Sequence, residues 1–186
     1  MLKRIQSMRK VIVLAIAALA LIGLRPAIAA SGHLIDQDSA AALQALYSSS
    51  PGAKALGDKA KGILVFPNVT KAGFIIGGQG GDGVLLIKGK PAAYYNTAAV
   101  SVGLQAGVQT FGYVLFFMSD SVLNGFRKSS GFEIGVGPNI VIIDAGAAKD
   151  LNTLTAKADV YAVIFDQKGL MAGVGIQGSK ITRINR

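Results

Sequence analysis

The sequence predicts an α+β fold: a mainly antiparallel, curved or barrel-like, glycine-rich β-sheet with a few short helices. Two observations carry this prediction. From residue 71 onward, short apolar runs of the strand type alternate with glycine-containing turns. Elsewhere, capping residues precede short segments with helical apolar spacing. Glycines also fall inside several predicted strands, where they permit bends or the close approach of a second element.

Three short helices are predicted from caps and apolar spacing. The first covers about residues 38–47, and the second begins at the serine–proline pair of residues 50–51 and runs to about residue 61. The third covers about residues 119–128, and Gly131 terminates it. Arg127 and Lys128 occupy its last turn, where cations interact favourably with the helix dipole.

The predicted strands are short and follow one another closely. They cover residues 63–66, 73–77, 84–88, 92–95, 100–108, 113–118, 132–136, 160–165 and 170–177. Pro67 and Asn68 are expected to end the first strand. Turns are predicted at residues 80–83, 88–91 and 166–169, because glycine and aspartate tolerate the positive φ of tight turns.

Residues 1–29 are predicted to be a cleavable signal peptide. Four cations precede an uncharged run at residues 11–24, and a small-residue stretch ending near Ala29 follows, which is the usual order of export signals. The run is shorter than the about 20 residues that span a bilayer core, so cleavage near Ala29 is favoured. An uncleaved anchor stays open as the alternative, because Arg25 can reach the membrane interface.

Residues 30–186 are predicted to form a single domain that is periplasmic or secreted. Five of the 19 Lys and Arg residues, and none of the ten acids, lie in residues 1–29, so the formal charge falls from +9 to +4 on cleavage. The remaining chain is long enough to bury about two thirds of its unfolded surface. Because the sequence has no cysteine, it cannot form disulfides or carry the acylated thiol of a lipoprotein.

The sequence offers little for catalysis or cofactor binding. Two segments that begin at Gly78 and Gly173 fit the pattern G-x-G-x-x-G, but neither opens a helix, as a dinucleotide loop must. The one histidine, His33, lies beside the predicted cleavage site, and the acids are scattered singly. We therefore expect no enzyme activity, no cofactor and no metal site. Export and the modest charge also argue against nucleic acid as a partner.

Basic residues recur near the predicted helix ends and turns. At an anionic membrane surface each is worth about 1 kcal/mol, so several together can hold a domain. The candidates for contact with lipid head groups are Lys59, Lys61 and Lys71, with Lys88, Arg127 and Lys128 as helpers. The alternative for each residue is an ordinary solvated surface lysine or arginine.

Three blocks of sequence carry a family resemblance. They are AKGILVFPNVTKAGFIIGGQGGDGVLLI at residues 60–87, YYNTAAVSVGLQAGVQTFGYVLFFMSDSVLNGF at residues 94–126, and KGLMAGVGIQGSKI at residues 168–181. These blocks resemble the SYLF family, also called the DUF500 or actin-patch-type domain. The resemblance implies a lipid-binding module without catalytic residues: animal and fungal relatives bind phosphoinositides, fungal ones also bundle actin, and bacterial relatives are exported. Eukaryotic members add an N-terminal amphipathic segment, whereas residues 36–47 here contain no lysine or arginine.

The predicted function is non-catalytic binding of anionic phospholipid or lipid A head groups at the bacterial envelope. The rival prediction is a structural or interaction protein of the envelope that binds a protein partner through an apolar surface, for which residues 114–118 (VLFFM) are the candidate. Phe116 and Phe117 would face opposite sides of a strand, so both can instead be buried between layers. Salt separates the two functions, because electrostatic lipid binding weakens as ionic strength rises.

Overall fold

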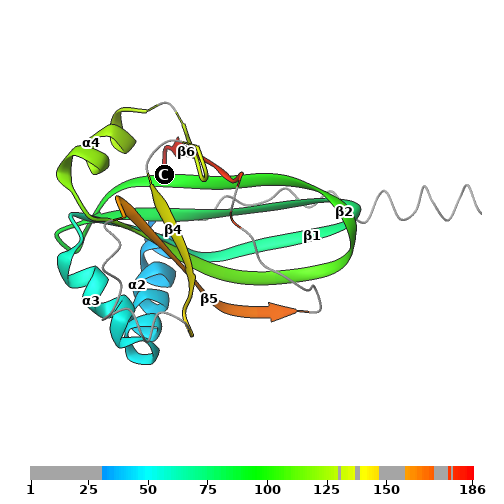
Figure 1. Cartoon of the computed structure of the whole chain (residues 1–186), viewed down its shortest axis with the longest axis horizontal. Coiled ribbons are helices and arrows are strands. Elements are labelled where there is room, and N and C mark those ends of the chain that lie inside the picture. The colour runs from blue at the N-terminus through cyan, green and yellow to red at the C-terminus, as the bar shows by residue number, and fades with distance from the viewer. Residues whose placement is uncertain (1–30, 130, 137–138, 147–157, 170–175, 177) are drawn as a thin grey trace, which may run out of the picture.

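The computed structural model describes residues 31–129, 131–136, 139–146, 158–169, 176 and 178–186. The predicted signal peptide lies outside these residues, as does the predicted strand 170–177 apart from residue 176. The elements are α2 (Gly32–Ser49), α3 (Pro51–Lys59), β1 (Gly62–Ile87), β2 (Lys90–Phe117), α4 (Asp120–Lys128), β3 (Phe132–Glu133), β4 (Ile140–Asp144), β5 (Val160–Gly169) and β6 (Lys180–Ile184). Figure 1 confirms the predicted α+β class with a curved, mainly antiparallel sheet.

One very long hairpin, folded over on itself, forms the centre of the sheet. β1 and β2 pair antiparallel along almost their whole lengths. A tight turn at Lys88 and Gly89, both with positive φ, joins them, so the turn predicted at residues 88–91 is confirmed. Midway along, the ribbon bends, and each strand therefore has two arms that lie over one another (Figure 1). The bend falls near Gly73, where an added Cβ would collide with the backbone of Gly77.

Glycines let the two arms of β1 approach closely. A Cβ on Gly81 would lie 2.5 Å from the carbonyl oxygen of Asn68, and a Cβ on Gly83 would overlap the carbonyl oxygen of Val65. The turn predicted at residues 80–83 is therefore wrong: these glycines continue the strand and serve its packing. The stop predicted at residues 67–68 is also wrong, because β1 passes this point through a register irregularity.

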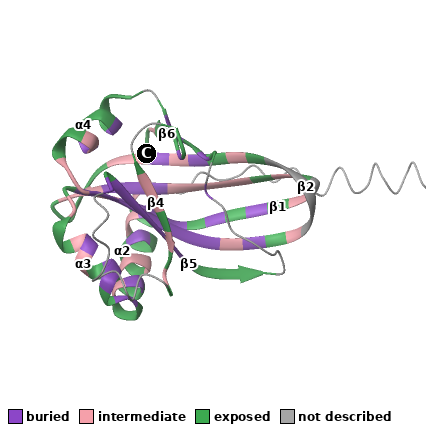
Figure 2. Cartoon of the chain, in the orientation of Figure 1, coloured by how far each residue is buried: buried purple, intermediate pink, exposed green. Residues whose placement is uncertain are grey.

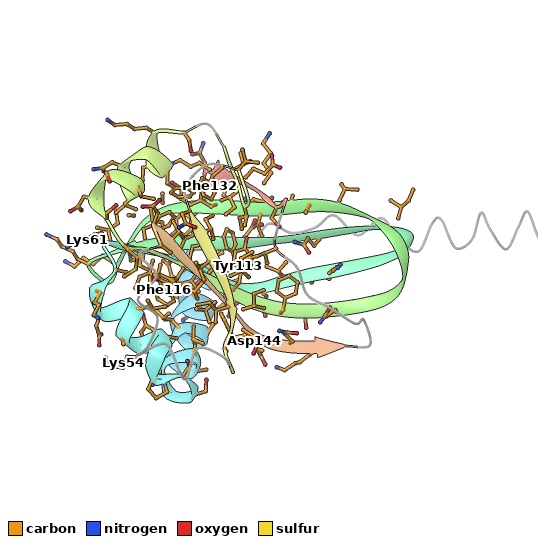
Figure 3. The ribbon with its side chains drawn as sticks, in the orientation of Figure 1. Lys54, Lys61, Tyr113, Phe116, Phe132 and Asp144 are labelled. Carbon is orange, nitrogen blue, oxygen red and sulfur yellow. The ribbon has the colours of Figure 1, made fainter. Side chains whose placement is uncertain are left out.

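Two apolar cores lie on the two faces of the second arm of β2. Phe117 and Tyr113 point between the arms, into an inner core that includes Phe66. Phe116 points the other way, into an outer core covered by α2 and α3 (Figure 3). Phe116 and Phe117 are both 0% exposed, which confirms that this segment is buried between layers. Residues 160–165 of β5 are buried alongside it, whereas the end of β5 is exposed (Figure 2).

The shorter strands extend the sheet on both sides of the folded hairpin. The order is β3-β6-β2-β5-β4, with β1 also paired to β2. Within the described residues β4 alone pairs in parallel, with β5. The sequence-based prediction contains neither β4 nor β6. Its turn at residues 166–169 is wrong, because β5 continues to Gly169 through an irregularity at which Asp166 adopts positive φ.

The helices begin at the capping residues that favour helix starts. Ser50 and Ser119 accept hydrogen bonds from Ala53 N and Val122 N, both at 3.4 Å, which confirms the predicted starts of α3 and α4. α2 begins earlier than predicted, because Ser31 acts as its cap. Within the described residues, no helix is long and apolar enough to span a membrane.

Replacement of Gly83 tests the close approach of the two arms. We expect Gly83→Ala to lower the free energy of unfolding by about 1–3 kcal/mol, because the new methyl group meets a backbone carbonyl that cannot rotate away. Gly78→Ala is the matched control on the same strand, since its nearest neighbour is the carbonyl oxygen of Ala99 at 3.8 Å. Urea denaturation measures both. Equal stability of the two variants would contradict the packing role of Gly83.

Tyr113 links the two arms of β2 and makes stability depend on pH. Its hydroxyl donates to Thr97 Oγ1 at 2.7 Å inside the core. Burial raises the pKa of Tyr113 well above its ordinary value of 10.0. The folded state therefore holds the phenolic proton more tightly than the unfolded state. This difference contributes to the free energy of unfolding below pH 10, and the contribution is lost as the pH rises further.

We expect Tyr113→Phe to cost about 1 kcal/mol at neutral pH through the lost hydrogen bond. Above pH 10 the difference in free energy of unfolding between wild type and variant should narrow. Unfolding lets the Tyr113 phenol of the wild type ionise, which lowers its stability, whereas the variant has no phenol at this position. Urea denaturation at several pH values between neutrality and pH 11 measures the gap. Parallel pH curves for the two proteins would contradict the assignment.

Candidate functional site

Five of the six predicted lipid-contact residues lie at one end of the folded hairpin. We call this surface the basic end and define it by Lys59, Lys61, Lys88, Arg127 and Lys128. All five are exposed. They come from the end of α3, the start of β1, the β1–β2 turn and the last turn of α4, and Figure 1 shows these elements at the end of the molecule opposite the bend.

Lys59 and Lys61 are held where α3 passes into β1. The backbone N–H of Lys61 donates to the carbonyl of Phe117 at 2.8 Å, so the start of β1 is fixed against the end of β2. The side chain of Lys61 points away from the sheet (Figure 3). Lys88 arrives at the same end because the fold-back returns the second arm of β1 towards its start (Figure 1).

The apolar face of α4 fixes Arg127 and Lys128 over the same end. The ring of Phe126 lies with its centroid 4.8 Å from those of Tyr95 and Phe117, one from each arm of β2. Both cations are in the last turn of α4. The side chain of Leu123 closes over Gly62 at the start of β1, where a Cβ would lie 2.7 Å from Leu123 Cδ1.

Two further cations stand close to the basic end. Lys90 follows the turn directly and is exposed. Arg183 on β6 is the register partner of Tyr95. Burial raises the pKa of Tyr95, and the positive charges of Arg183 and Arg127 oppose that rise, which places both guanidinium groups near this ring. Lys90 belongs to a predicted turn and could have been included from sequence, whereas Arg183 arrives only through the pairing of β6.

The charge of the basic end is not cancelled by ion pairs with the described residues. The ion pairs among those residues are Lys54 with Asp58, Lys168 with Asp166, and Arg186 with Asp82. None of them includes a residue of the basic end. Its ammonium and guanidinium groups therefore remain available to an external anion.

Lys71 lies apart from the other predicted contact residues. It follows Lys61 by ten residues of extended strand, which is roughly 33 Å at 3.3 Å per residue. It is only 7% exposed and is the register partner of Gln109, whose side-chain oxygen is buried without a partner among the described residues. The predicted cluster of Lys59, Lys61 and Lys71 is therefore not assembled in the fold.

A groove lies between α2 and the sheet. Its volume is about 550 Å³, and small or apolar side chains such as Ala41, Ala45 and Phe165 line it together with the carboxylates of Asp38 and Asp166. Lys168 pairs with Asp166, which leaves Asp38 as the carboxylate of the lining without an ion pair among the described residues, and no Lys or Arg lines the groove to attract an anionic head group. Within the described residues, no group of three or more His, Cys, Asp or Glu side chains could hold a metal ion.

Comparison with known proteins supports the resemblance found in the sequence. Residues 98–185 match the family model described as "Ysc84: Las17-binding protein actin regulator". The match includes most of the block at residues 94–126 and the block at residues 168–181, whereas residues 60–87 lie outside it.

Curated relatives are similar at low identity. The chain is 24% identical over 126 residues to "SH3 domain-containing YSC84-like protein 1" of Rattus norvegicus, an alignment that covers 65% of this chain and 37% of the relative. It is 26% identical over 130 residues to "Protein YSC84" of Saccharomyces cerevisiae, which covers 66% of this chain and 28% of the relative. The chain thus spans roughly a third of the length of the relatives it matches.

The different environments of Lys71 and Lys61 predict different responses to substitution. We expect Lys71→Glu to lower the free energy of unfolding by about 2 kcal/mol or more, because a carboxylate would be buried without a cation. Lys61→Glu, at an exposed position, should change it by less than about 0.5 kcal/mol. Urea denaturation of both variants decides the matter. If Lys71→Glu were as stable as Lys61→Glu, the burial of Lys71 would be contradicted.

Proposed function

We infer the function from the premise that this chain, through residues 98–185, belongs to the SYLF (Ysc84) family, and we propose that it is a non-catalytic module that binds anionic lipid. The ligands proposed are phospholipid or lipid A head groups at the bacterial envelope. The observation that carries the proposal is the basic end, where five exposed cations from separate parts of the chain are gathered without ion-pair partners among the described residues.

The number and exposure of these cations suit a membrane surface. At about 1 kcal/mol for each Lys or Arg near an anionic leaflet, five provide weak, reversible attachment. Their side chains come from two helix ends, a strand start and a turn, so they form a broad surface and not a closed pocket. Such a surface suits head groups in a bilayer better than a single small anion. Export of the domain, proposed from residues 1–29, would bring it to such a bilayer.

A protein partner is the second candidate. The matched family is described as a Las17-binding actin regulator, so a related domain is named for binding a protein. The surface first expected to do this, residues 114–118, is almost entirely buried: the four residues from Val114 to Phe117 are 0% exposed. The groove beside α2, lined by Asp38 and by the Lys168-paired Asp166, is one surface for such a partner.

Flotation with lipid vesicles tests the lipid proposal. The domain of residues 30–186 should bind increasingly as the fraction of anionic phospholipid rises, and binding should disappear at high salt. Lys61→Gln with Lys88→Gln should weaken binding at low salt by about 2 kcal/mol, or roughly thirtyfold. Lys71 is left unchanged, because its replacement would confuse loss of binding with loss of stability.

Lys168→Gln with Lys180→Gln is the matched control, because it removes the same two charges at exposed positions away from the basic end. Equal weakening in both double variants would refute the basic end and leave only a general effect of net charge. Binding to no vesicle composition would refute the lipid function itself and favour the protein partner.

A further inference from the structure

Exposed aliphatic side chains gather at the bend of the folded hairpin. We call this part the bent tip and define it as residues 72–81 of β1 and 98–108 of β2. Of the six large apolar side chains that are exposed among the described residues, three lie here: Ile76 is 65% exposed, Val100 80% and Val108 58%. Their concentration on two paired segments distinguishes the tip from scattered apolar exposure.

The three side chains belong to one continuous ribbon. Ile76 pairs with Val102 and Gly78 with Val100, so Ile76 and Val100 are diagonal neighbours on the same face. Val108 pairs with Ala72 on the other side of the bend. Figure 1 shows this bend at the far end of the molecule from α3 and α4, with no described helix packed against it.

The bent tip carries no charge. No Asp, Glu, Lys or Arg occurs in residues 72–81 or 98–108, and the whole stretch of residues 91–119 is uncharged. The chain is basic overall and carries cations on most other elements. Part of this stretch, such as residues 113–117, is buried in the core, where charge is not expected. At the exposed bend, the absence of charge is a local feature of residues 72–81 and 98–108.

Pairing of β1 with β2 satisfies the backbone groups that face between the two strands of the tip, whereas the groups on the two outer edges around the bend have no strand partner among the described residues. β1 and β2 pair from Ala72 opposite Val108 to Gly78 opposite Val100, with a register shift between Phe74 and Ile76. Unpaired backbone groups are what prevent most loops from entering hydrocarbon. Only the groups between the two strands avoid that penalty, so the insertion we consider is shallow: aliphatic side chains enter the hydrocarbon and the open strand edges stay at the membrane interface.

The size of the tip separates two possible occupants. A second copy of the chain would have to bury about 800 Å² on each partner to form a standard interface, and three aliphatic side chains at the end of a two-stranded ribbon provide far less. A lipid bilayer needs no complementary surface. It gains from each apolar side chain that leaves water and is compatible with the absence of charge.

We propose that the bent tip inserts into the hydrocarbon of a lipid bilayer, with Ile76, Val100 and Val108 as the inserted side chains. This contact lies at the opposite end from the basic end and does not depend on it. A flat membrane can meet only one of the two ends of a molecule at a time. Tip insertion is therefore a second mode of membrane contact, driven by apolar burial and insensitive to salt.

Tryptophan fluorescence locates the insertion, because the sequence contains no tryptophan. Protein purified after expression of the full chain is mixed with uncharged phosphatidylcholine vesicles at about 1 M salt, where the Debye length is about 3 Å and the basic end is screened. Val100→Trp should shift its emission to shorter wavelength and be quenched by brominated lipid. Val136→Trp, at another exposed valine (64%) outside the tip, should do neither.

Charged variants test the energetics at the same site. Val100→Asp should weaken binding to these vesicles at high salt by about tenfold or more. Insertion of the tip would then require a carboxylate to enter hydrocarbon, which costs free energy. Val136→Asp should bind like wild type. Both variants should keep salt-sensitive binding to anionic vesicles if the basic end works as proposed, so failure of one proposal leaves the other measurable.

Three results would overturn tip insertion. One is an equal response of Val100→Trp and Val136→Trp to vesicles. Another is unchanged binding of Val100→Asp. The third is a Val100→Trp emission shift that depends on protein concentration and not on lipid, which would assign the tip to contact between two copies of the chain. A retained N-terminal anchor would add equally to the binding of every variant, and the position-specific fluorescence would still decide.

Discussion

The rest of the structure depends on how closely the two arms of β1 approach each other. At Gly81 and Gly83 bare backbone lies against the backbone of the other arm, and a side chain there would collide with carbonyl oxygens. This contact allows the long hairpin to double over and enclose Tyr113 in the inner core. A straight hairpin would leave that apolar face in water, and two strands alone are at best marginally stable.

Doubling over also sorts charge along the molecule. The turn at Lys88 returns to the start of β1, so cations that are distant in sequence gather at one end, while the uncharged bend forms the other. α4 then secures the charged end, because Phe126 packs against one residue from each arm of β2. The same fold thus separates a surface suited to head groups from a surface suited to hydrocarbon.

The sequence predicted most of the basic residues of the candidate site, but not which of them lie together in space. Nearness in sequence places Lys71 with Lys59 and Lys61, yet an extended strand carries it away from them and into the interior. Strand alternation is a better guide, since it predicts correctly that Phe116 and Phe117 face opposite layers. Arg183 carries no signal in the sequence, because only the pairing of β6 with β2 brings it to Tyr95.

By itself the sequence determined the features that depend on a few neighbouring residues: the caps at Ser50 and Ser119, and the tight turn at Lys88 and Gly89. Only the tertiary structure decided whether other glycine-rich segments turn or continue. Residues 80–83 and 166–169 have the composition of turns but stay in strands, because backbone distant in the chain packs against them or pairs with them. Those contacts are made with residues far away in the sequence, so a local sequence pattern cannot predict them.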